Sequence, residues 1–282
     1  MSRWPHVPFD LQGHRGARGL APESTVASFD AAIAHGVTGI EFDVRLTADG
    51  EVVVWHDPTL QADKCTFGGA DLTDALVADL TLAQLRTVDI GSRTLTAYPQ
   101  QVAAPGARIL TLAELFDRYA AEHPRLWWTV EVKVDPNDPR EVATREALTA
   151  KVVEAINDSG VADRSFVHSF DWTVLEIAER LDASLIRSAL LGAPESFAEG
   201  SPWIGSIDPR DHRDIAAAVA SMGASVISPY YLWCNEPSFV ARAHEEGLGV
   251  LPWTVNEPTD IDAVRGAGVD GLVTDFPDRV DH

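Results

Sequence analysis

The sequence predicts an α/β fold in which eight parallel strands alternate with helices and close into a barrel. Short apolar runs alternate with amphipathic helical patterns along the chain. Several runs are almost entirely apolar, as expected for parallel strands that are covered on both faces. The length of 282 residues suits one such barrel, which takes roughly 250 residues as a single domain. We therefore expect a single TIM (β/α)₈ barrel domain over residues 1–282.

The strands are expected where the apolar runs lie, at residues 9–13, 39–46, 128–133, 165–168, 184–190, 225–228, 249–254 and 271–274. The segments between them show the apolar spacing of amphipathic helices. Val26, Phe29 and Ile33 share one helix face, and Gly36 is a typical residue after a helix end. Residues 138–139 are Asp-Pro, which favours the start of another helix. Strand and helix therefore alternate as a barrel requires.

Residues 58–109 do not fit this alternation. They lie between the second and third barrel strands and are far too long for an ordinary connection. The segment is rich in Thr, Asp and Ala, and its pattern predicts one helix at residues 80–88. The simplest interpretation is a small surface insertion. A cap over the barrel mouth is the functional interpretation, and it is favoured because the segment starts directly after His56-Asp57, at the end of the barrel that carries the site.

Charge and composition exclude several kinds of partner. Asp and Glu number 43 against 22 Lys and Arg, which gives a net charge of −21. A field of this sign repels nucleic acid and anionic membrane surfaces, so we expect neither nucleic-acid binding nor stable membrane association. The two cysteines, Cys65 and Cys234, form no disulfide framework and are expected to be partly buried thiols. Without a long apolar run or a signal core, the chain is expected to be cytoplasmic. Its oligomeric state stays open.

Two strands carry acidic side chains at matching positions. Glu41 and Asp43 are two residues apart in an apolar segment, so their carboxylates point to the same face. Glu131 and Lys133 repeat this spacing on the next barrel strand. Three carboxylates that converge would suit Mg²⁺ or Ca²⁺ better than zinc, and the ligand types do not choose between those two ions. The structural alternative is a salt-bridged pair near the strand end that involves Arg45.

A charge count tests this interpretation. The three carboxylates carry −3, whereas a divalent cation, Arg15 and Lys133 together carry +4. The resulting charge of +1 would neutralise a phosphodiester, which carries −1. The same side chains without the cation leave a charge of −1, which repels that substrate. The count therefore predicts that the site needs its cation.

Two histidines stand out from the others. His14 follows the first strand, and His56 follows the apolar segment at residues 51–55. Because histidine titrates near neutral pH, one ring can take a proton from a nucleophile while the other gives one to a leaving alkoxide. Asp57 either orients His56 or caps the loop. The remaining histidines, His168 among them, are expected to be structural or exposed.

These residues belong to a series of motifs that extends over most of the chain. The motifs are Gly13-His14-Arg15-Gly16, Pro22-Glu23-Ser24-Thr25, Glu41-Phe42-Asp43-Val44, Asp49-Gly50, His56-Asp57, Glu131-Val132-Lys133, Trp253-Thr254-Val255-Asn256 and Thr274-Asp275-Phe276-Pro277. From residue 13 to residue 277 the series resembles the glycerophosphodiester phosphodiesterase family. Its first part is highly specific, and the later motifs support it.

The resemblance implies a TIM barrel with a small insertion after the second strand. It implies hydrolysis of glycerophosphodiesters to an alcohol and sn-glycerol 3-phosphate with the help of a divalent cation. It assigns the metal to Glu41, Asp43 and Glu131, acid–base catalysis to His14 and His56, and phosphate contacts to Arg15 and Lys133. Trp253 either fills the barrel core or contacts the glycerol or alcohol moiety, and Phe170 is a weaker candidate for that contact.

One position departs from the family pattern. The family usually has Pro-Glu-Asn-Thr where this chain has Ser24. Asn and Ser are both good N-caps, so we favour a capping role for Ser24 at the start of the following helix.

Several alternatives stay open. A lysophospholipase D-type or phosphoinositide-cleaving enzyme would use the same barrel. A catalytically inactive phosphodiester-binding barrel and a carboxylate-metal aldolase or lyase are further candidates, but the intact histidine pair argues against both. The nucleophile is either a water activated by the cation or the 2-hydroxyl of the substrate itself. The preferred alcohol is also open.

Overall fold

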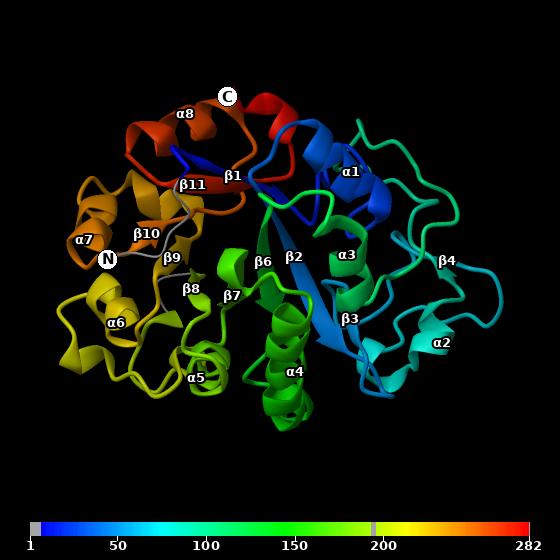
Figure 1. Ribbon diagram of the computed structural model, residues 1–282, viewed down its shortest axis with the longest axis horizontal. Helices are drawn as coiled ribbons and strands as arrows, with labels where there is room; N and C mark the ends of the chain where they lie inside the picture. The colour runs from blue at the N-terminus through cyan, green and yellow to red at the C-terminus, as the bar shows by residue number, and fades with distance from the viewer. Residues whose placement is uncertain (1–6, 193–195, 282) are drawn as a thin grey trace.

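The computed structural model describes residues 7–192 and 196–281, and in this part of the chain eight parallel strands form a barrel (Figure 1). The order around the sheet is β10-β9-β8-β7-β6-β2-β1-β11. The barrel closes between β10 and β11, where Val255 N donates to Val273 O at 2.9 Å and Val273 N donates to Pro252 O at 2.9 Å. The strands are β1 (Asp10–His14), β2 (Gly39–Leu46), β6 (Trp127–Val132), β7 (Ser165–Ser169), β8 (Ile186–Leu191), β9 (Val226–Pro229), β10 (Gly249–Val250) and β11 (Gly271–Thr274). The predicted fold class is confirmed.

Helices cover the outside of this barrel, and all of the described α-helices except the last two along the chain begin with a side-chain cap hydrogen bond. Asp138 caps the longest helix by accepting from Arg140 N at 2.8 Å, and Pro139 occupies its first turn. Thr111 and Glu114 form a capping box on another. No helix among the described residues is long and apolar enough to cross a membrane. The helices are α1 (Val26–Ala34), α3 (Leu112–Tyr119), α4 (Pro139–Asp158), α5 (Trp172–Leu181), α6 (Ile215–Ser221), α7 (Phe239–Glu245) and α8 (Pro258–Gly266).

Strand β10 is shorter than the sequence predicts. The expected strand at residues 249–254 contracts to Gly249–Val250. Pro252 lacks an N–H and cannot donate to a regular ladder. Leu251 N and Trp253 N still donate to Ile227 O and Pro229 O of β9, both at 3.0 Å. The irregular backbone therefore keeps Trp253 at the carboxyl end of the barrel.

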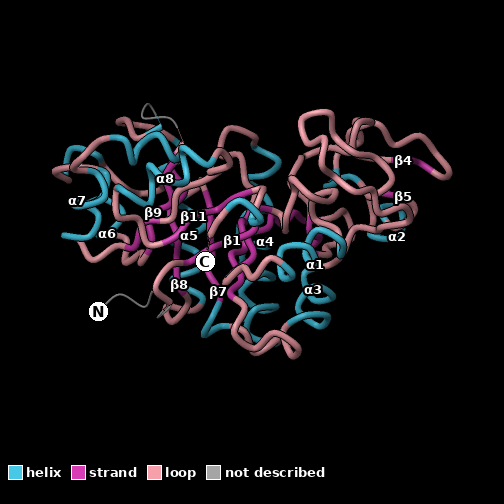
Figure 2. Tube along the Cα trace, turned by 90° about the horizontal axis from the view of Figure 1, so that it is seen from above, coloured by secondary structure: helices cyan, strands magenta, loops and turns pink. Residues whose placement is uncertain are grey.

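Residues 58–109 carry elements and an apolar cluster of their own. Strand β3 (Val52–Val54), just before the segment, pairs with β2 in the antiparallel direction. Strands β4 (Thr66–Phe67) and β5 (Val88–Asp89) form a small two-stranded sheet. Figure 2 shows both strands and helix α2 (Leu82–Leu85) together at one end of the molecule, beside the barrel. Their buried side chains include Leu60, Leu85, Val88 and Ile109.

The predicted helix at residues 80–88 is one turn long. Thr81 caps α2 with a complete capping box, but the helix ends at Leu85. Val88 and the residue after it leave the helical pattern because they pair with Thr66 and Phe67 as strand β5. A β-branched residue favours that pleated position over a helix.

The register of the sheet brings the predicted site residues to one level. His14 lies opposite Glu41 in the β1–β2 pair, and Asp43 lies opposite Glu131 in the β2–β6 pair. Glu131 in turn lies opposite His168 on β7. All these positions are at or near the carboxyl ends of their strands, which is where barrels of this kind carry their sites.

Candidate active site

Three buried carboxylates form an acidic cluster in this barrel mouth. One oxygen each from Glu41, Asp43 and Glu131 lie within 4.8 Å of one another. Burial and the two acidic neighbours raise the pKa of Glu41 well above its usual value. Both carboxylate oxygens of Asp43 are buried, and among the described residues they form ion pairs but no hydrogen bond. Buried oxygen ligands with unused lone pairs suit a hard divalent cation, so these residues fit a metal site.

Arg15 reaches this cluster from a tight turn after β1. Its φ of 51° lies in the left-handed region, and the next residue, Gly16, has φ 86°. A Cβ on Gly16 would lie 2.3 Å from Ser28 Oγ, so only glycine fits there. Ser28 Oγ donates to Arg15 O at 2.8 Å and fixes the turn. The His-Arg-Gly motif therefore sets the direction in which the guanidinium leaves the strand.

Arg15 and Lys133 are the cations closest to the acidic cluster. Arg15 Nε lies 3.2 Å from Asp43 Oδ2, and its backbone N–H donates to Glu41 Oε2 at 3.3 Å. Lys133 Nζ lies 2.7 Å from Glu131 Oε1 and 3.6 Å from Asp43 Oδ1. Both side chains are nearly buried. They are placed to share an anionic ligand with a cation bound at the carboxylates.

The carboxylate of Asp275, which follows directly after strand β11, holds the ring of His14. His14 Nδ1 and Asp275 Oδ1 are 2.6 Å apart, so Nε2 faces the cavity, 3.8 Å from Glu41 Oε2. Burial lowers the pKa of His14 to about 4, and Arg15 and Arg18 add to this, while Asp275 opposes it. The ring is therefore neutral at pH 7, and its cavity-facing nitrogen is free to accept a proton.

Asp275 is the centre of a dense hydrogen-bond network. Its Oδ1 also accepts from Arg18 Nε at 3.0 Å. Its Oδ2 accepts from Arg18, from Tyr98 OH at 3.0 Å and from Asn256 Nδ2 at 2.7 Å. Burial alone would raise the pKa of Asp275, but His14 and Arg18 hold it well below its usual value. The carboxylate is thus charged and fixed in one orientation.

His56 has a similar carboxylate partner. Asp57 Oδ1 lies 2.8 Å from His56 Nδ1, so Asp57 orients the ring and is no loop cap through that oxygen. Lys64 Nζ lies 2.5 Å from Asp57 Oδ2 and 2.9 Å from Glu23 Oε1. Glu23 in turn accepts from Arg15 at 3.0 Å. A chain of charges therefore connects the second histidine, through the segment at residues 58–109, with Arg15.

A cavity of about 200 Å³ joins these groups. The predicted site residues that line it are His14, Arg15, Glu41, His56, Glu131, Lys133 and Trp253. Asp43 lies beneath the cavity floor and contacts Arg15 and Lys133. Trp253 donates its Nε1–H to Ser228 O at 3.0 Å and packs edge-on against the ring of Phe170, 5.3 Å away. It is therefore part of the cavity wall.

Several residues of the site were not predicted as such. His168, expected to be structural, lines the cavity, and burial lowers its pKa to about 3. Asp275 lies in a recognised motif, but nothing in the sequence pairs it with His14, 261 positions away. Tyr98 and Lys64 come from the irregular segment after β3 and show no sequence signal at all. Their contacts show that this segment reaches the barrel mouth.

The preferred role of Ser24 is wrong. The N-cap of α1 is Thr25, whose Oγ1 accepts from Ser28 N at 3.1 Å. Ser24 has φ 58° and is fully buried, and its Oγ makes no hydrogen bond within the described part of the chain. The left-handed region disfavours most residues but tolerates Asn, which explains why the family usually has Asn at this position. The sequence correctly indicates a helix cap in this motif, but the capping residue is Thr25 and not Ser24.

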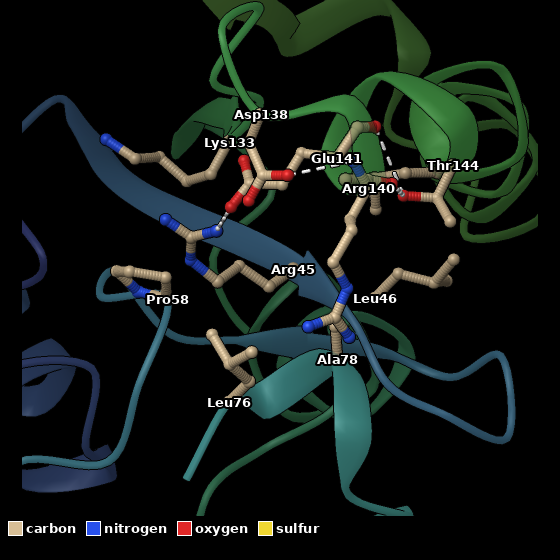
Figure 3. A pocket seen from close by; sticks show the side chains of 11 residues that line it. Arg45, Leu46, Pro58, Leu76, Ala78, Lys133, Asp138, Arg140, Glu141 and Thr144 are labelled. Carbon is tan, nitrogen blue, oxygen red and sulfur yellow. Dashed lines mark hydrogen bonds and ion pairs between the residues drawn. The ribbon is translucent and has the colours of Figure 1, made fainter. Parts of the chain in front are cut away.

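Arg45 is not the partner of the acidic pair. Figure 3 shows its guanidinium directed toward Glu141 at the start of α4, with NH1 3.0 Å from Glu141 Oε1. Arg45 Nε also donates to His56 O at 2.7 Å. Arg45 and Glu141 border a smaller neighbouring cavity of about 150 Å³, which shares Lys133 with the catalytic cavity. Arg45 thus connects the backbone carbonyl of His56 with Glu141 of α4.

The structure enlarges the charge count. Four cations and six carboxylates form a connected cluster in and around the cavity, with a formal charge of −2 when every carboxylate is ionised and both histidines are neutral. The sequence alone gave −1. The groups are Arg15, Arg18, Lys64 and Lys133 against Glu23, Glu41, Asp43, Asp57, Glu131 and Asp275. This formal count is one unit more negative than the count from the sequence and, like the raised pKa of Glu41, it favours a cation among these carboxylates.

The fold and this site together define a hydrolase of phosphate diesters on an α/β barrel. A profile of the Glycerophosphoryl diester phosphodiesterase family matches residues 14–279. A glycerophosphodiester phosphodiesterase from Caldanaerobacter subterraneus subsp. tengcongensis is 28% identical over 267 residues, which cover 95% of this chain and 94% of that protein. The chain belongs to the glycerophosphodiester phosphodiesterase family.

Solved structures agree with this assignment. A protein from Silicibacter pomeroyi DSS-3 that carries the same family name is 34% identical, with a TM-score of 0.84, and the match covers 98% of this chain and 92% of that one. An Oleispira antarctica phosphodiesterase, solved with the product sn-glycerol-3-phosphate, is 23% identical with a TM-score of 0.75 and coverages of 98% and 96%. The second match supports the fold.

Proposed function

We propose that this enzyme hydrolyses small glycerophosphodiesters to an alcohol and sn-glycerol 3-phosphate, with a divalent cation held by Glu41, Asp43 and Glu131. The observation that carries the proposal is the arrangement of the buried acidic cluster between His14 and His56 in one cavity. Bound there, the cation would neutralise carboxylate charge and polarise a phosphoryl oxygen. The Oleispira relative, which was solved with this product, supports the choice of substrate class.

The two histidines take different roles. His14 is neutral, and Asp275 holds its Nδ1, so its Nε2 accepts the proton of the nucleophile. His56, protonated and held at Nδ1 by the carboxylate of Asp57, donates the proton of Nε2 to the leaving oxygen and becomes neutral. Each transfer typically contributes 10²- to 10⁴-fold. Because one ring must be neutral and the other protonated, activity follows a bell-shaped dependence on pH.

Arg15 and Lys133 position the phosphate. Arg15 offers a rigid fork of donors beside the carboxylates, and Lys133 offers a point charge on the neighbouring strand. The nucleophile is water or the 2-hydroxyl of the glycerol. Hydrolysis in ¹⁸O-labelled water, followed by analysis of a cyclic phosphate by ³¹P NMR, separates the two, because only the second route passes through the cyclic ester.

The test of the proposal is release of glycerol 3-phosphate from glycerophosphocholine. We expect turnover in wild type and a loss of 10²- to 10⁴-fold in His14→Ala. His35→Ala, at the exposed end of α1, is the matched control and should keep wild-type activity. Turnover of His14→Ala near the wild-type rate would contradict the acid–base assignment.

A lysophospholipase D-type activity is the second candidate, and one observation favours it. An apolar cavity adjoins the catalytic cavity and shares Phe170 and Leu190 with it. The apolar and aromatic lining of this space suits a hydrocarbon chain. Comparing turnover of lysophosphatidylcholine with that of glycerophosphocholine separates the two candidates.

A further inference from the structure

An apolar cavity adjoins the catalytic cavity. Its volume is about 330 Å³, larger than the 200 Å³ of the catalytic cavity. Apart from Ser196, the side chains that line it among the described residues are apolar or aromatic. The main ones are Phe170, Trp172, Leu190, Leu191, Trp203 and Ile204. No charged group of the catalytic centre faces this space.

Phe170 forms the wall between the two cavities. Its ring packs edge-on against Trp253 of the catalytic cavity, 5.3 Å away, and edge-on against Trp203 of the apolar cavity, 6.5 Å away. Lys133 Nζ lies 5.7 Å from the same ring. Leu190 also lines both cavities. A group attached to a phosphate held near Lys133 therefore lies next to the boundary, formed by Phe170 and Leu190, between the two cavities.

The indole N–H of Trp172, on the wall of the apolar cavity, already has a hydrogen-bond acceptor. Trp172 is almost fully buried, and its Nε1–H donates to Leu190 O at 3.2 Å. A hydroxyl or carboxylate group placed against Trp172 would lose water there without gaining a hydrogen bond. An alkyl chain has no such cost, because apolar surface gains free energy when it leaves water. Aromatic faces do attract a quaternary ammonium such as choline, so glycerophosphocholine is the reference against which a chain effect is measured.

We propose that this cavity is a subsite for a single alkyl or acyl chain carried by the phosphodiester substrate. The inference rests on the proposed function and deepens it, because it adds a preference for substrates with an apolar substituent. The catalytic cavity holds the phosphate and the glycerol, and the chain passes Phe170 into the second cavity. The chain can be attached to the leaving alcohol or to the glycerol, since both flank the phosphate.

The size of the cavity limits the length of the chain. A cavity of about 150 Å³ lined by aliphatic side chains and Phe is large enough to bind benzene. A volume of about 330 Å³ therefore corresponds to roughly twice that group, or a chain of about eight to ten carbons. Carbons beyond that length extend into solvent and add nothing. The subsite thus predicts a rise in affinity with chain length that levels off.

The experiment measures kcat/KM for glycerophosphodiesters of ethanol, butanol, octanol and dodecanol, with glycerophosphocholine as the reference. A second arm uses 1-octanoyl-glycerophosphocholine, in which the chain is on the glycerol. Burial of a methylene should raise kcat/KM about two- to fourfold. We expect at least a tenfold gain from ethanol to octanol, or from glycerophosphocholine to its octanoyl ester, and no further gain at dodecanol.

A filled cavity supplies the matched comparison. Ile204→Trp places a large ring in the apolar cavity and should abolish the chain-length gain. Ile33→Trp is the control, because Ile33 lines a separate cavity with Val37 and Thr38, at the amino end of strand β2. The readout is the ratio of the octanol to the ethanol substrate, so a general loss of activity does not affect it. An unchanged ratio in Ile204→Trp would contradict the placement of the chain.

Direct binding separates failure of this inference from failure of the proposed function. Methyl, butyl and octyl phosphate are titrated into the wild-type protein by calorimetry. We expect tighter binding and a more negative heat-capacity change with each longer chain. If glycerophosphocholine is hydrolysed but neither substrate arm nor the alkyl phosphates show a chain effect, the subsite is refuted. If no diester is hydrolysed while the alkyl phosphates still show the chain effect, the subsite holds and the proposed function is wrong.

Discussion

Asp275→Asn tests whether a buried carboxylate fixes the protonation of His14. The replaced group has one oxygen toward His14 Nδ1 and Arg18 Nε and the other toward donors from Arg18, Tyr98 and Asn256. The amide oxygen of the variant belongs on the second side, where the donors are most numerous. Its NH₂ group then faces His14 Nδ1 and forces that nitrogen to accept. The proton moves to Nε2, which can no longer act as a base.

The size of the effect follows from this geometry. A histidine in the wrong tautomer loses its role as a general base, which typically contributes 10²- to 10⁴-fold, or about 3–5 kcal/mol of barrier. The 2.6 Å contact between His14 and Asp275 leaves no room for water to restore the original tautomer. We therefore expect kcat on glycerophosphocholine to fall by at least 10²-fold, with a much smaller change in KM.

The assay combines kinetics with ¹⁵N NMR of the histidine rings, which reports the tautomer directly. Asp278→Asn is the matched control, because it removes the same charge from an exposed position of the same loop. Wild-type kcat in Asp275→Asn, or a loss of kcat with the His14 tautomer unchanged, would refute the reasoning.

Three further predictions concern stability and reactivity. Burial raises the pKa of Asp10 to about 6 from its usual 3.8, so ionisation of this carboxyl destabilises the fold as pH rises through this range. Asp10→Asn should therefore raise the free energy of unfolding by up to about 3 kcal/mol at pH 7.5 but only about 1 kcal/mol at pH 4.5. Urea unfolding in which this gain does not depend on pH would contradict the prediction. Thr25→Ala should cost about 1 kcal/mol and Ser24→Ala almost nothing, because Thr25 is the cap; the reverse order in thermal unfolding would restore the capping role to Ser24. Burial raises the pKa of the Cys65 and Cys234 thiols to about 12. Ellman's reagent at pH 8 should therefore label them only after unfolding. Rapid labelling of the native protein would count against their burial.

The barrel could be predicted because its signal is local. Each barrel strand is a short apolar run, and parallel strands that are covered on both faces need no further information to be recognised. The two-residue spacing of Glu41 and Asp43 likewise fixes their common face. The structure pairs β2 with β6 in a register that sets Asp43 opposite Glu131, as the matching positions of the two motifs had indicated. Local pattern and barrel geometry together were enough to predict the acidic cluster.

The contacts that orient the site could not be predicted, because they depend on distant segments. Asp275 meets His14 across the closure of the barrel, and Tyr98 reaches Asp275 from a segment with little regular structure. Arg45 forms its ion pair with Glu141, at the start of α4, and not with the acidic pair that is nearer to it in sequence, because α4 contacts β2. Ser24 and Thr25 offer the same chemistry as caps, and only the left-handed backbone at Ser24 separates them.

The central claim is that the three carboxylates hold a divalent cation on which hydrolysis depends. Glycerol 3-phosphate release should be measured after chelation, after return of Mg²⁺ or Ca²⁺, and in Glu41→Gln beside the exposed control Glu51→Gln. We predict that chelation lowers activity by at least 10²-fold, that one of the two ions restores it, and that only Glu41→Gln fails to respond. Full activity after chelation, or restored activity in Glu41→Gln equal to that of Glu51→Gln, would contradict the claim.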